Sequence, residues 1–552
     1  MNLMVTRLFG TDGIRGKVDI SLVEEKQVIE KLLVKREISP PLFRLLGEVL
    51  GRIYDLFPGQ GNEVVIGWDQ RPNNELLAEY LTLGLQISGM KVTHIGICAT
   101  PTLHYATLEN SARIGCMITA SHNPVSDSGL KVFDSNGYKT TPEIEDHISK
   151  VAEHLAKEER EIDAIEHQIL TTPNKDLSKS GWSKNHHISI LNERFNIFKQ
   201  LFGDIKKDKT NIFSTPFLLD SSKGFAGEWL ASWINENTGI ECREISSQAT
   251  VMNHNCGAGE ISPTQTWTFE QASQDNHILI NQLTPAESGT IVAAALDGDG
   301  DRCLIIQATP TGFKVVDGDE IADLVVNAGT ISGNDWVLAA SIESDLSLLS
   351  NLDRFPTKVK PIETAVGDRW LSFALRNNLN NNSDDKTPSP TVIGVEDSGH
   401  IVLPSRHPMS DISWTLVGDG AATLVAYFLA ILNHEPNNSM NRGWKKRVSA
   451  QEVNRDLWDG KNTLSDEVEN IAREKLSALG NLKNWTRSDL DGEPNLMLIH
   501  ANMDSGELSL GIRNSGTQAK ISVSLRLSSE IKTQGMKEVV EYLAQFLKSR
   551  MS

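Results

Sequence analysis

Three aspartates alternate with two glycines in the segment Asp297–Arg302, which directly follows the apolar run Thr290–Leu296. A tight loop of this composition can bring three carboxylates onto one cation, and all-oxygen ligation favours a hard ion, Mg²⁺ before Zn²⁺. The arginine at the end of the segment can hold an anion that the metal also touches. The segment therefore predicts a magnesium site, with Arg302 beside it, formed by Asp297, Asp299 and Asp301.

Two other interpretations of this acidic segment exist. It matches the first residues of a calcium EF-hand loop, which requires glycine at its sixth position and glutamate at its twelfth. Counted from Asp297, these positions hold Arg302 and Ala308, so the calcium-loop interpretation fails. A purely structural acidic turn is the remaining alternative and is less favoured than a metal site.

A serine and a histidine are adjacent in the segment Thr119–Pro124. The preceding residues 113–118 are mostly apolar and predict a short buried strand, which Pro124 prevents from continuing. A serine hydroxyl on the turn that follows is exposed and held in one orientation, as a nucleophile or a phosphate carrier requires. The alternative is an ordinary turn, and these six residues alone do not decide whether Ser121 and His122 do chemistry.

Two basic residues elsewhere in this half of the chain are further candidates. Arg15 lies in the glycine-rich loop Leu8–Gly16, where a guanidinium fork suits a bidentate grip on phosphate or carboxylate. Lys131, in Gly129–Phe133, is a candidate acid or base because apolar neighbours can lower the pKa of a lysine. A surface arginine on a structural turn and a lysine at a strand edge are the commoner explanations when each is taken alone.

Three polar loops later in the chain carry side chains that are candidates for ligand binding. Thr364–Trp370 is a glycine turn that contains Arg369, and Glu396–His400 carries a carboxylate, a hydroxyl and an imidazole that can recognise sugar hydroxyls. Arg513–Lys520 combines charge, hydroxyls and exposed backbone N–H groups, which together form a nest for phosphate. Each loop taken alone can also be a polar turn without function.

These loops follow elements that alternate along the chain. Apolar strands are predicted at residues 63–67 and 91–97, and helices at residues 20–37, 42–56 and 76–88. Alternating apolar strands and helices are typical of α/β layers, in which ligands gather at the carboxyl ends of the strands. The sequence therefore predicts an α/β fold with its polar loops at these ends.

Three hydrophilic stretches interrupt the pattern. Residues 154–187 predict a helix end and a flexible connector in which His186 and His187 are solvated, residues 377–390 a mobile surface loop, and residues 433–446 a linker. Together with the strand pattern they predict four domains, at residues 1–187, 188–310, 311–436 and 447–552.

The composition limits the class of protein. A chain of 552 residues is too long for one core, and 39% apolar and 23% charged residues suit a soluble globular protein. A net charge of −19 argues against a general nucleic-acid binder but allows small phosphorylated ligands in a local basic pocket. The five cysteines are scattered without a C-x-x-C pair, which predicts free thiols in a reducing compartment. No apolar run suits a signal peptide or a membrane span, so we expect a cytoplasmic protein without a membrane partner.

Five of these segments occur in the order of one family. T-D-G-I-R-G at the start, T-A-S-H-N-P, D-G-D-G-D-R, E-x-S-G-H and R-x-S-G-T resemble the α-D-phosphohexomutase superfamily over nearly the whole chain. The resemblance implies three related α/β domains around a central cleft and a C-terminal α+β domain. It also implies a monomeric or homodimeric isomerase that moves phosphate between O6 and O1 of a hexose. A phosphoserine, a bisphosphorylated intermediate and Mg²⁺ would take part, so the expected ligands are a hexose phosphate and a hexose bisphosphate.

The resemblance assigns roles to residues of this sequence. Ser121 would carry the phosphoryl group, and Mg²⁺ would contact this phosphate as well as the three aspartates. Arg15, His122 and Lys131 match the basic residues of the family's active site, and Lys131 is the candidate for proton transfer. The remaining matches are expected to bind the substrate: Arg302, Arg369, Glu396, Ser398, His400, Arg513, Ser515, Gly516 and Thr517.

Several positions depart from the family pattern without removing a chemical group. Ser128 replaces the usual asparagine before Gly129, and Val395 stands where glycine is usual. In the phosphate loop, three residues replace the usual Pro, Glu and Pro and leave its backbone less fixed: Asn514, Gln518 and Ala519.

The substrate is less determined by the resemblance than the reaction. Leu8–Gly16 and the turn at residues 366–369 are most like the phosphoglucosamine mutases, which convert glucosamine 6-phosphate to glucosamine 1-phosphate. Phosphomannomutase or phosphoglucomutase activity is the alternative, and a paralogue that binds phosphosugars without turnover is the alternative from another class. Asp397 stands where that subgroup usually has glutamine, and one hypothesis is that it meets the ammonium group of the substrate.

Overall fold

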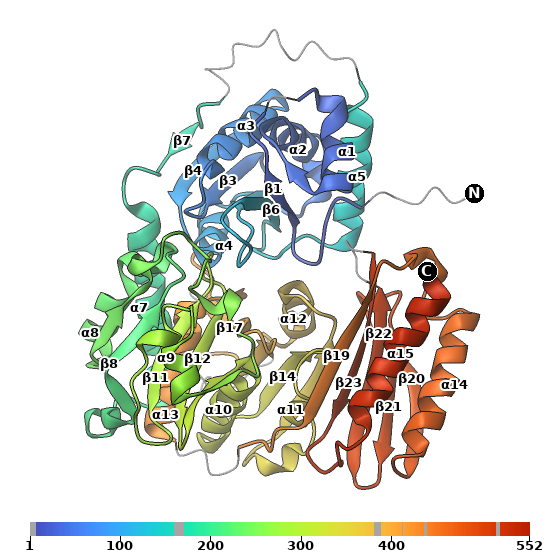
Figure 1. Ribbon diagram of the computed structural model, residues 1–552. Coiled ribbons are helices and arrows are strands. Elements are labelled where there is room, and N and C mark those ends of the chain that lie inside the picture. Colours follow the sequence, from blue (N-terminus) through green and yellow to red (C-terminus); the bar gives the residue numbers. More distant parts are fainter. Residues whose placement is uncertain are drawn as a thin grey trace. The chain divides into compact units, whose positions relative to one another are not determined.

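The computed structural model describes residues 7–21, 23–158, 171–379, 388–410, 412–434, 439–514 and 519–552. Four β-sheets and their helices make up these residues (Figure 1). The chain divides into two compact units. The first comprises Met1–Ile321, Arg376–Pro390 and Ser398–Glu435, and the second comprises Ala322–Leu375, Thr391–Asp397 and Pro436–Ser552.

The first sheet lies in the first unit. Its strands are β1 (Ile14–Val18), β2 (Glu37–Ile38), β3 (Glu63–Trp68), β4 (Lys91–Ile97), β5 (Ile114–Ile118), β6 (Asp127–Asp134) and β7 (Lys175–Asp176). They are ordered β2-β1-β6-β5-β3-β4-β7. β3 runs parallel to β4 and β5, whereas β6 is antiparallel to β5 and β1. Every residue of β5 is buried, which accounts for its unbroken apolar sequence.

Five helices accompany this sheet: α1 (Glu25–Lys35), α2 (Pro40–Arg52), α3 (Asn74–Ile87), α4 (Thr100–Glu109) and α5 (Pro142–Leu155). The three helices predicted in this region are confirmed as α1, α2 and α3, with ends shifted by a few residues. α2 and α3 pack with their backbones in contact. A Cβ at Gly47 would lie 2.3 Å from the Leu81 carbonyl oxygen, and one at Gly84 would lie 2.0 Å from that of Arg44. Glycine is therefore needed at both positions.

The second sheet also belongs to the first unit. Its strands are β8 (Phe213–Asp220), β9 (Cys242–Glu244), β10 (Thr266–Thr268), β11 (Ile291–Leu296), β12 (Cys303–Thr309) and β13 (Gly312–Val316). They are ordered β10-β13-β12-β11-β8-β9, and β8 and β11 are parallel. The acidic segment Asp297–Arg302 therefore follows the carboxyl end of a buried parallel strand. The helices α7 (Trp182–Phe202), α8 (Leu230–Thr238), α9 (Phe269–Ser273) and α13 (Gly420–Asn433) lie in the same unit.

Each unit contains further strands from the middle of the chain. β14 (Trp336–Ser341), β15 (Val359–Thr364) and β16 (Val392–Val395) are parallel strands of the second unit, with α11 (Leu346–Leu349) and α12 (Asp368–Leu375). β17 (Ile401–Arg406) and β18 (Trp414–Gly418) form an antiparallel pair in the first unit. The helix α10 (Gly318–Ile331) begins in the first unit and continues into the second.

The fourth sheet lies in the second unit and is antiparallel throughout. Its strands are β19 (Trp444–Gln451), β20 (Leu482–Ser488), β21 (Met497–Met503), β22 (Gly506–Asn514) and β23 (Lys520–Leu527). They are ordered β19-β23-β22-β21-β20, and α14 (Thr463–Ser477) and α15 (Met536–Met551) pack beside them (Figure 1). The predicted α/β class is thus confirmed, together with an α+β arrangement at the C-terminal end.

The prediction that His186 and His187 are solvated is wrong, because both lie in α7 and their side chains are only 14% and 2% exposed. His187 is buried and its Nδ1 lies 2.9 Å from the Thr102 hydroxyl. Its Nε2 lies 3.5 Å from the carboxylate of Asp419, just before α13. Residues 159–170 of the predicted connector, 380–387 of the predicted surface loop and 435–438 of the predicted linker lie outside the described residues.

Two further expectations concern the whole chain. All five cysteines are buried and unpaired, as predicted. In the described residues, no helix combines the length and the apolar character that a membrane span requires.

Candidate active site

Ser121 lies in the turn between β5 and β6, beyond the carboxyl end of β5. Its backbone has φ of +53°, in the left-handed region that residues with side chains rarely adopt and that is frequent at functional sites. Its Oγ donates a 2.9 Å hydrogen bond to Asp297 Oδ2. The expectation of an exposed hydroxyl is wrong, since Ser121 is only 1% exposed and its side chain faces the aspartate loop.

The three aspartates of the acidic segment converge as predicted. Their ligand atoms all lie within 4.8 Å of one another, and all three residues are buried. Asp297 Oδ1 accepts hydrogen bonds of 3.1 Å from the backbone N–H groups of Asp301 and Arg302, which close the loop. A Cβ at position 298 would lie 2.9 Å from the Ser121 carbonyl oxygen, so Gly298 lets the two loops touch.

The aspartate group fits a hard divalent cation. It offers only carboxylate oxygens, which Mg²⁺ prefers. Asp299 Oδ1 is buried and has no hydrogen-bond partner among the residues that the structure describes. Burial, together with repulsion from Asp301 and Asp299, raises the pKa of Asp297 well above its usual range. Positive charge at this point would relieve that repulsion, so the group could bind a metal ion.

Lys131 of β6 brings a positive charge into contact with this group. Its Nζ lies 2.7 Å from Asp299 Oδ2, 3.0 Å from Asp301 Oδ2 and 3.2 Å from Asp12 Oδ2. Burial alone would lower the pKa of Lys131, but these three carboxylates raise it well above its usual range. The predicted lowering is therefore wrong, because the side chain reaches past its apolar sequence neighbours to acids from distant loops.

Two arginines lie beside the same loops. Arg15 of β1 donates to Asp12 Oδ2 at 2.8 Å and to Asn123 Oδ1, in the serine turn, at 3.4 Å. Arg302 Nε lies 3.9 Å from Asp297 Oδ2. Two guanidinium groups thus border the serine turn and the aspartate loop, where an anion next to Ser121 would meet them.

His122 lies against the serine hydroxyl, with its Nδ1 3.4 Å from Ser121 Oγ. Burial, with smaller contributions from Arg302 and Arg15, lowers the pKa of His122 to about 3. The imidazole is therefore neutral near pH 7 and adds a donor or an acceptor without adding charge.

The loop Glu396–His400 ends against the aspartate group. His400 Nδ1 lies 3.4 Å from Asp301 Oδ1, and His400 also forms an isolated antiparallel bridge with Arg302. Ser398 Oγ is buried and has no hydrogen-bond partner among the described residues. Within the first unit, His400 therefore supports a predicted metal ligand, and Ser398 retains an unused hydroxyl.

Glu396 and Arg369 belong to the second unit. Glu396 Oε1 accepts a 2.7 Å hydrogen bond from the backbone N–H of Gly367, which lies in the turn that leads into α12. Arg369 is the second residue of that helix. The ammonium hypothesis favours a free carboxylate at Asp397. Instead, Asp397 Oδ2 is paired with Lys445 Nζ.

Arg513 lies near the end of β22, where it bonds two carboxylates of the second unit. Its Nη1 lies 2.5 Å from Glu493 Oε1 and its Nη2 lies 2.9 Å from Glu343 Oε1. The three other predicted phosphate-binding residues, Ser515, Gly516 and Thr517, lie outside the described residues.

Several known proteins resemble this chain. The phosphoglucosamine mutase of Salinispora arenicola is 27% identical over 415 residues, which are 73% of this chain and 76% of that protein. The phosphoglucosamine mutase of Corynebacterium aurimucosum is 29% identical over 412 residues, which are 72% of this chain and 75% of that protein.

Solved structures share the fold. A phosphoglucomutase/phosphomannomutase family protein from Burkholderia thailandensis has a TM-score of 0.61 at 18% identity, over 99% of this chain and 98% of that chain. The N-acetylphosphoglucosamine mutase of Aspergillus fumigatus, solved with GlcNAc-6P and magnesium, has a TM-score of 0.52 at 16% identity. The match covers 82% of this chain and 92% of that chain.

Two family models match the sequence itself. Domain I of the phosphoglucomutase/phosphomannomutase family, described as alpha/beta/alpha, matches residues 6–159, and its domain III matches residues 317–447. Together they account for more than half of the chain. The chain belongs to the α-D-phosphohexomutase superfamily. It is therefore an isomerase, a mutase of hexose phosphates.

The structure adds two residues to this phosphohexomutase site that motif analysis missed. The first is Arg71, a buried residue just after β3 that is paired with Asp69 at 3.0 Å. Its guanidinium donates to the carbonyl oxygens of Ser121 at 2.6 Å, Asn123 at 2.8 Å and Asp127 at 3.0 Å, and also to that of Pro124. In the sequence, Arg71 could have been found as a charged residue just after the carboxyl end of a buried parallel strand, where ligands gather.

The second is Asn253, which lies between β9 and β10. Its Nδ2 donates to the carbonyl oxygens of Ser121 at 2.7 Å and Asn123 at 2.9 Å, while its Oδ1 accepts from Ser222 Oγ. The serine turn of the phosphohexomutase is thus held by side chains from two distant segments of the first unit. In the sequence, residues 253–259 stand out only because they contain two asparagines and two glycines, a composition typical of a turn.

Proposed function

We propose that this phosphohexomutase converts glucosamine 6-phosphate to glucosamine 1-phosphate, with Ser121 carrying the phosphoryl group. The observation that carries the proposal is the 2.9 Å hydrogen bond from Ser121 Oγ to Asp297 Oδ2. It joins a conformationally restricted hydroxyl to a group of three carboxylates bordered by Arg15, Arg302 and Lys131. A hydroxyl, a cation site and positive side chains are what phosphoryl transfer needs in one place.

The proposed reaction has two transfers. In the first, the Oγ–P bond of phosphorylated Ser121 breaks and a P–O bond forms to sugar O1, which gives glucosamine 1,6-bisphosphate. In the second, after the intermediate has turned over, the O6–P bond breaks and the phosphoryl group returns to Ser121. The proton lost by O1 balances the one gained by O6, so Ser121 ends as it began.

The residues around Ser121 would have different roles in each phosphoryl transfer. Mg²⁺ held by the three aspartates would neutralise charge on the phosphoryl group. Arg15, Arg302 and neutral His122 would orient that group, since all three side chains border the serine turn or the aspartate loop. Lys131 would carry the proton of each transfer, giving one to the oxygen that loses its phosphoryl group and regaining one from the attacking hydroxyl.

The remaining predicted residues are proposed to hold the rest of the substrate. Glu396, Ser398 and His400 would contact the sugar, and Arg369 would lie beside them. The phosphate that is not reacting would bind to Arg513, Ser515, Gly516 and Thr517. One such pocket positions either end of the sugar phosphate for transfer at Ser121.

The choice of glucosamine is supported by relatives that carry the name phosphoglucosamine mutase. Phosphomannomutase or phosphoglucomutase activity is the second candidate, because the matching family models carry both names. We further propose the four-domain division at residues 1–187, 188–310, 311–436 and 447–552 and a cytoplasmic location. As a monomer or homodimer, the protein would bind hexose phosphate and hexose bisphosphate.

A substrate panel tests the function. Purified protein would receive Mg²⁺, a trace of hexose bisphosphate and, separately, the 6-phosphates of glucosamine, glucose and mannose, with Ser121→Ala alongside. We expect a preference for glucosamine phosphate, no turnover by Ser121→Ala, and a phosphorylated peptide containing Ser121 in the wild type. Preference for glucose or mannose phosphate would favour the second candidate. Binding without turnover of any sugar would favour a paralogue that only binds.

A further inference from the structure

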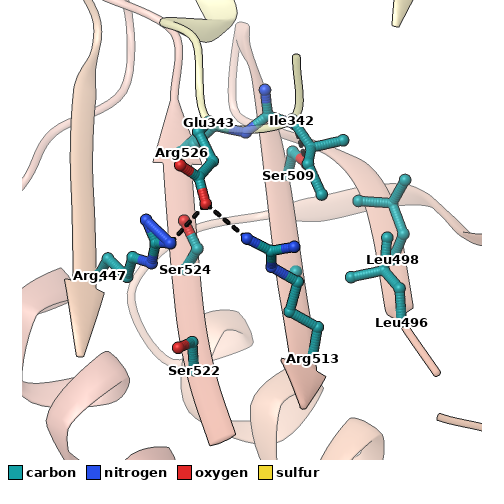
Figure 2. A pocket seen from close by; sticks show the side chains of 11 residues that line it. Ile342, Glu343, Arg447, Leu496, Leu498, Ser509, Arg513, Ser522, Ser524 and Arg526 are labelled. Atoms are coloured by element: carbon teal, nitrogen blue, oxygen red, sulfur yellow. Dashed lines mark hydrogen bonds and ion pairs between the residues drawn. The ribbon is translucent and has the colours of Figure 1, made fainter. Parts of the chain in front are cut away.

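Two arginines of the second unit share one carboxylate oxygen. Glu343 Oε1 accepts hydrogen bonds from Arg447 Nη2 and from Arg513 Nη2, the latter at 2.9 Å (Figure 2). Arg447 comes from β19, Arg513 from β22, and Glu343 from the segment between β14 and α11. Two guanidinium groups on separate strands therefore point at the same anionic atom.

A third arginine on this surface shows what a purely structural role looks like. The side chain of Arg526 on β23 is 4% exposed and donates to Ser344 O at 3.2 Å, Ser509 Oγ at 2.8 Å and Glu363 Oε1 at 2.6 Å. Its guanidinium is occupied by fixed partners of the protein. We therefore do not include Arg526 in an exchangeable site.

The Arg447–Glu343–Arg513 group differs because solvent reaches it. The side chain of Arg447 is 44% exposed and that of Glu343 is 23% exposed. A pocket opens beside the shared oxygen, lined by Gly511 and by the hydroxyl residues Ser522 and Ser524 (Figure 2). Ion pairs open to water are weak and exchange partners with dissolved ions. Another anion can therefore compete with Glu343 for these two arginines.

We propose that Arg447 and Arg513 form one anion-binding site, which Glu343 occupies in the free enzyme and which the non-reacting phosphate of the substrate takes over. This adds Arg447 as a binding residue and Glu343 as its internal competitor. The proposal rests on the proposed function, in which Arg513 holds that phosphate.

Charge and geometry explain why a phosphate can replace the carboxylate. Removing Glu343 alone would leave two like charges facing one another, so another anion must take its place. A phosphate monoester carries more charge than a carboxylate and has three free oxygens, which allows it to bind both guanidinium forks. Glu493 holds the other side of Arg513, at 2.5 Å, so this guanidinium keeps its orientation during the exchange.

Binding of inorganic phosphate tests the site without relying on catalysis. Titration calorimetry would be done without divalent cations, so that the aspartate group near Ser121 repels the probe. The proteins would be wild type, Glu343→Gln, Arg447→Gln, Arg513→Gln and Arg550→Gln. Arg550 is a matched control, because it pairs with Glu467 at 3.0 Å elsewhere in the same unit.

We expect Glu343→Gln to bind phosphate about tenfold more tightly than wild type, because the competing charge is gone, and Arg447→Gln about tenfold more weakly. Arg550→Gln should match wild type. Because the two variants are expected to move in opposite directions, misfolding of either one cannot imitate the full pattern.

Two outcomes would overturn the inference. If Arg513→Gln loses phosphate binding while Arg447→Gln and Glu343→Gln match wild type, Arg447 and Glu343 form only a structural ion pair, and the proposed function stands. If Arg513→Gln also binds phosphate like wild type, the phosphate-binding role of Arg513 falls as well.

Discussion

Arg71 Nη2 donates a 2.6 Å hydrogen bond to the carbonyl oxygen of Ser121. The same guanidinium bonds three more carbonyl oxygens of the turn and is itself held by Asp69. Ser121 has a backbone conformation that is unfavourable for a residue with a side chain. Through these carbonyl oxygens, Arg71 thus stabilises the backbone conformation that directs the Ser121 hydroxyl toward Asp297.

Replacing Arg71 by lysine should separate this positioning role from bulk stability. Lysine keeps the charge opposite buried Asp69 but cannot form the planar fork that binds several carbonyl oxygens. We expect kcat/KM to fall about 100-fold, because a small misplacement of a reacting group has an effect of this size. Steady-state kinetics would be combined with mass spectrometry of Ser121 phosphorylation.

The matched control for this variant is Arg113→Lys. Arg113 also donates to a backbone carbonyl, that of Phe57, but it lies before β5, at the opposite end of that strand from the serine turn. We expect it to retain kcat/KM within about threefold of wild type, because its contacts lie away from the reacting groups. Equal losses in the two variants, or none in Arg71→Lys, would contradict a positioning role for Arg71.

The contrast between Ser121 and Arg71 shows what the sequence could predict. Ser121 and the aspartates lie in short segments whose composition indicates their chemistry, and these loops follow strands that periodicity reveals. Arg71 and Asn253 act on the Ser121 carbonyl oxygen from 50 and 132 residues away. Every residue has a carbonyl, so such a contact leaves no pattern in the sequence.

Lys131 and His187 show why some environments could not be predicted. The strand around Lys131 is apolar, but the acids that meet its Nζ come from the loops of Asp12 and Asp299. The segment around His187 is hydrophilic on average, but one face of α7 is buried. In both cases the surroundings are set by tertiary contacts rather than by neighbours in the sequence.

His400 should tune metal binding through Asp301. Its Nδ1 lies 3.4 Å from Asp301 Oδ1, so the imidazole orients a carboxylate that we propose as a ligand. Loss of such a supporting contact typically weakens metal binding 10- to 100-fold. We therefore expect His400→Gln to bind Mg²⁺ at least about tenfold more weakly, as measured by calorimetry without substrate and by the Mg²⁺ concentration for half-maximal activity.

His434→Gln is the control for the metal experiment. His434 belongs to the same unit and bonds the Phe202 carbonyl oxygen at 3.0 Å, away from the aspartate group. Its Mg²⁺ affinity should equal that of wild type. An unchanged Mg²⁺ affinity in His400→Gln would mean that the contact with Asp301 does not support the metal site.

Asp397→Asn should not change the choice between amino and neutral sugars. The carboxylate is already paired with Lys445, which neutralises the charge that an ammonium group would need. We expect KM for glucosamine 6-phosphate and for glucose 6-phosphate to change by the same factor. Lys445→Gln is the comparison variant. It frees the Asp397 carboxylate, so we expect it to lower KM for glucosamine 6-phosphate relative to glucose 6-phosphate. A selective loss on glucosamine phosphate in Asp397→Asn would restore the ammonium hypothesis.

Asp419 links α7 to the start of α13 and makes stability depend on pH. Burial by itself raises its pKa, but His187 and Arg194, the latter at 3.1 Å, bring the pKa of Asp419 to about 2. A carboxyl that ionises near pH 3.9 in the unfolded chain and lower in the fold stabilises the protein above about pH 4. That contribution, about 2.5 kcal/mol, is lost progressively as pH falls below about 4 and through 2.

Asp419→Asn tests this link. Asparagine can still accept the 3.1 Å hydrogen bond from the Ala422 N–H that caps α13, but it leaves Arg194 buried without its anion. We expect the urea midpoint at pH 7 to drop by an amount equivalent to about 3–5 kcal/mol for the first unit. The difference in unfolding free energy between Asp419→Asn and wild type should be smaller at pH 3, because the wild-type carboxylate then loses part of its stabilising contribution. Asp55→Asn is the control: its exposed carboxylate pairs with Arg113, and it should be as stable as wild type at both pH values. A difference that stays constant from pH 7 to pH 3 would assign the loss to packing rather than to the charge of Asp419.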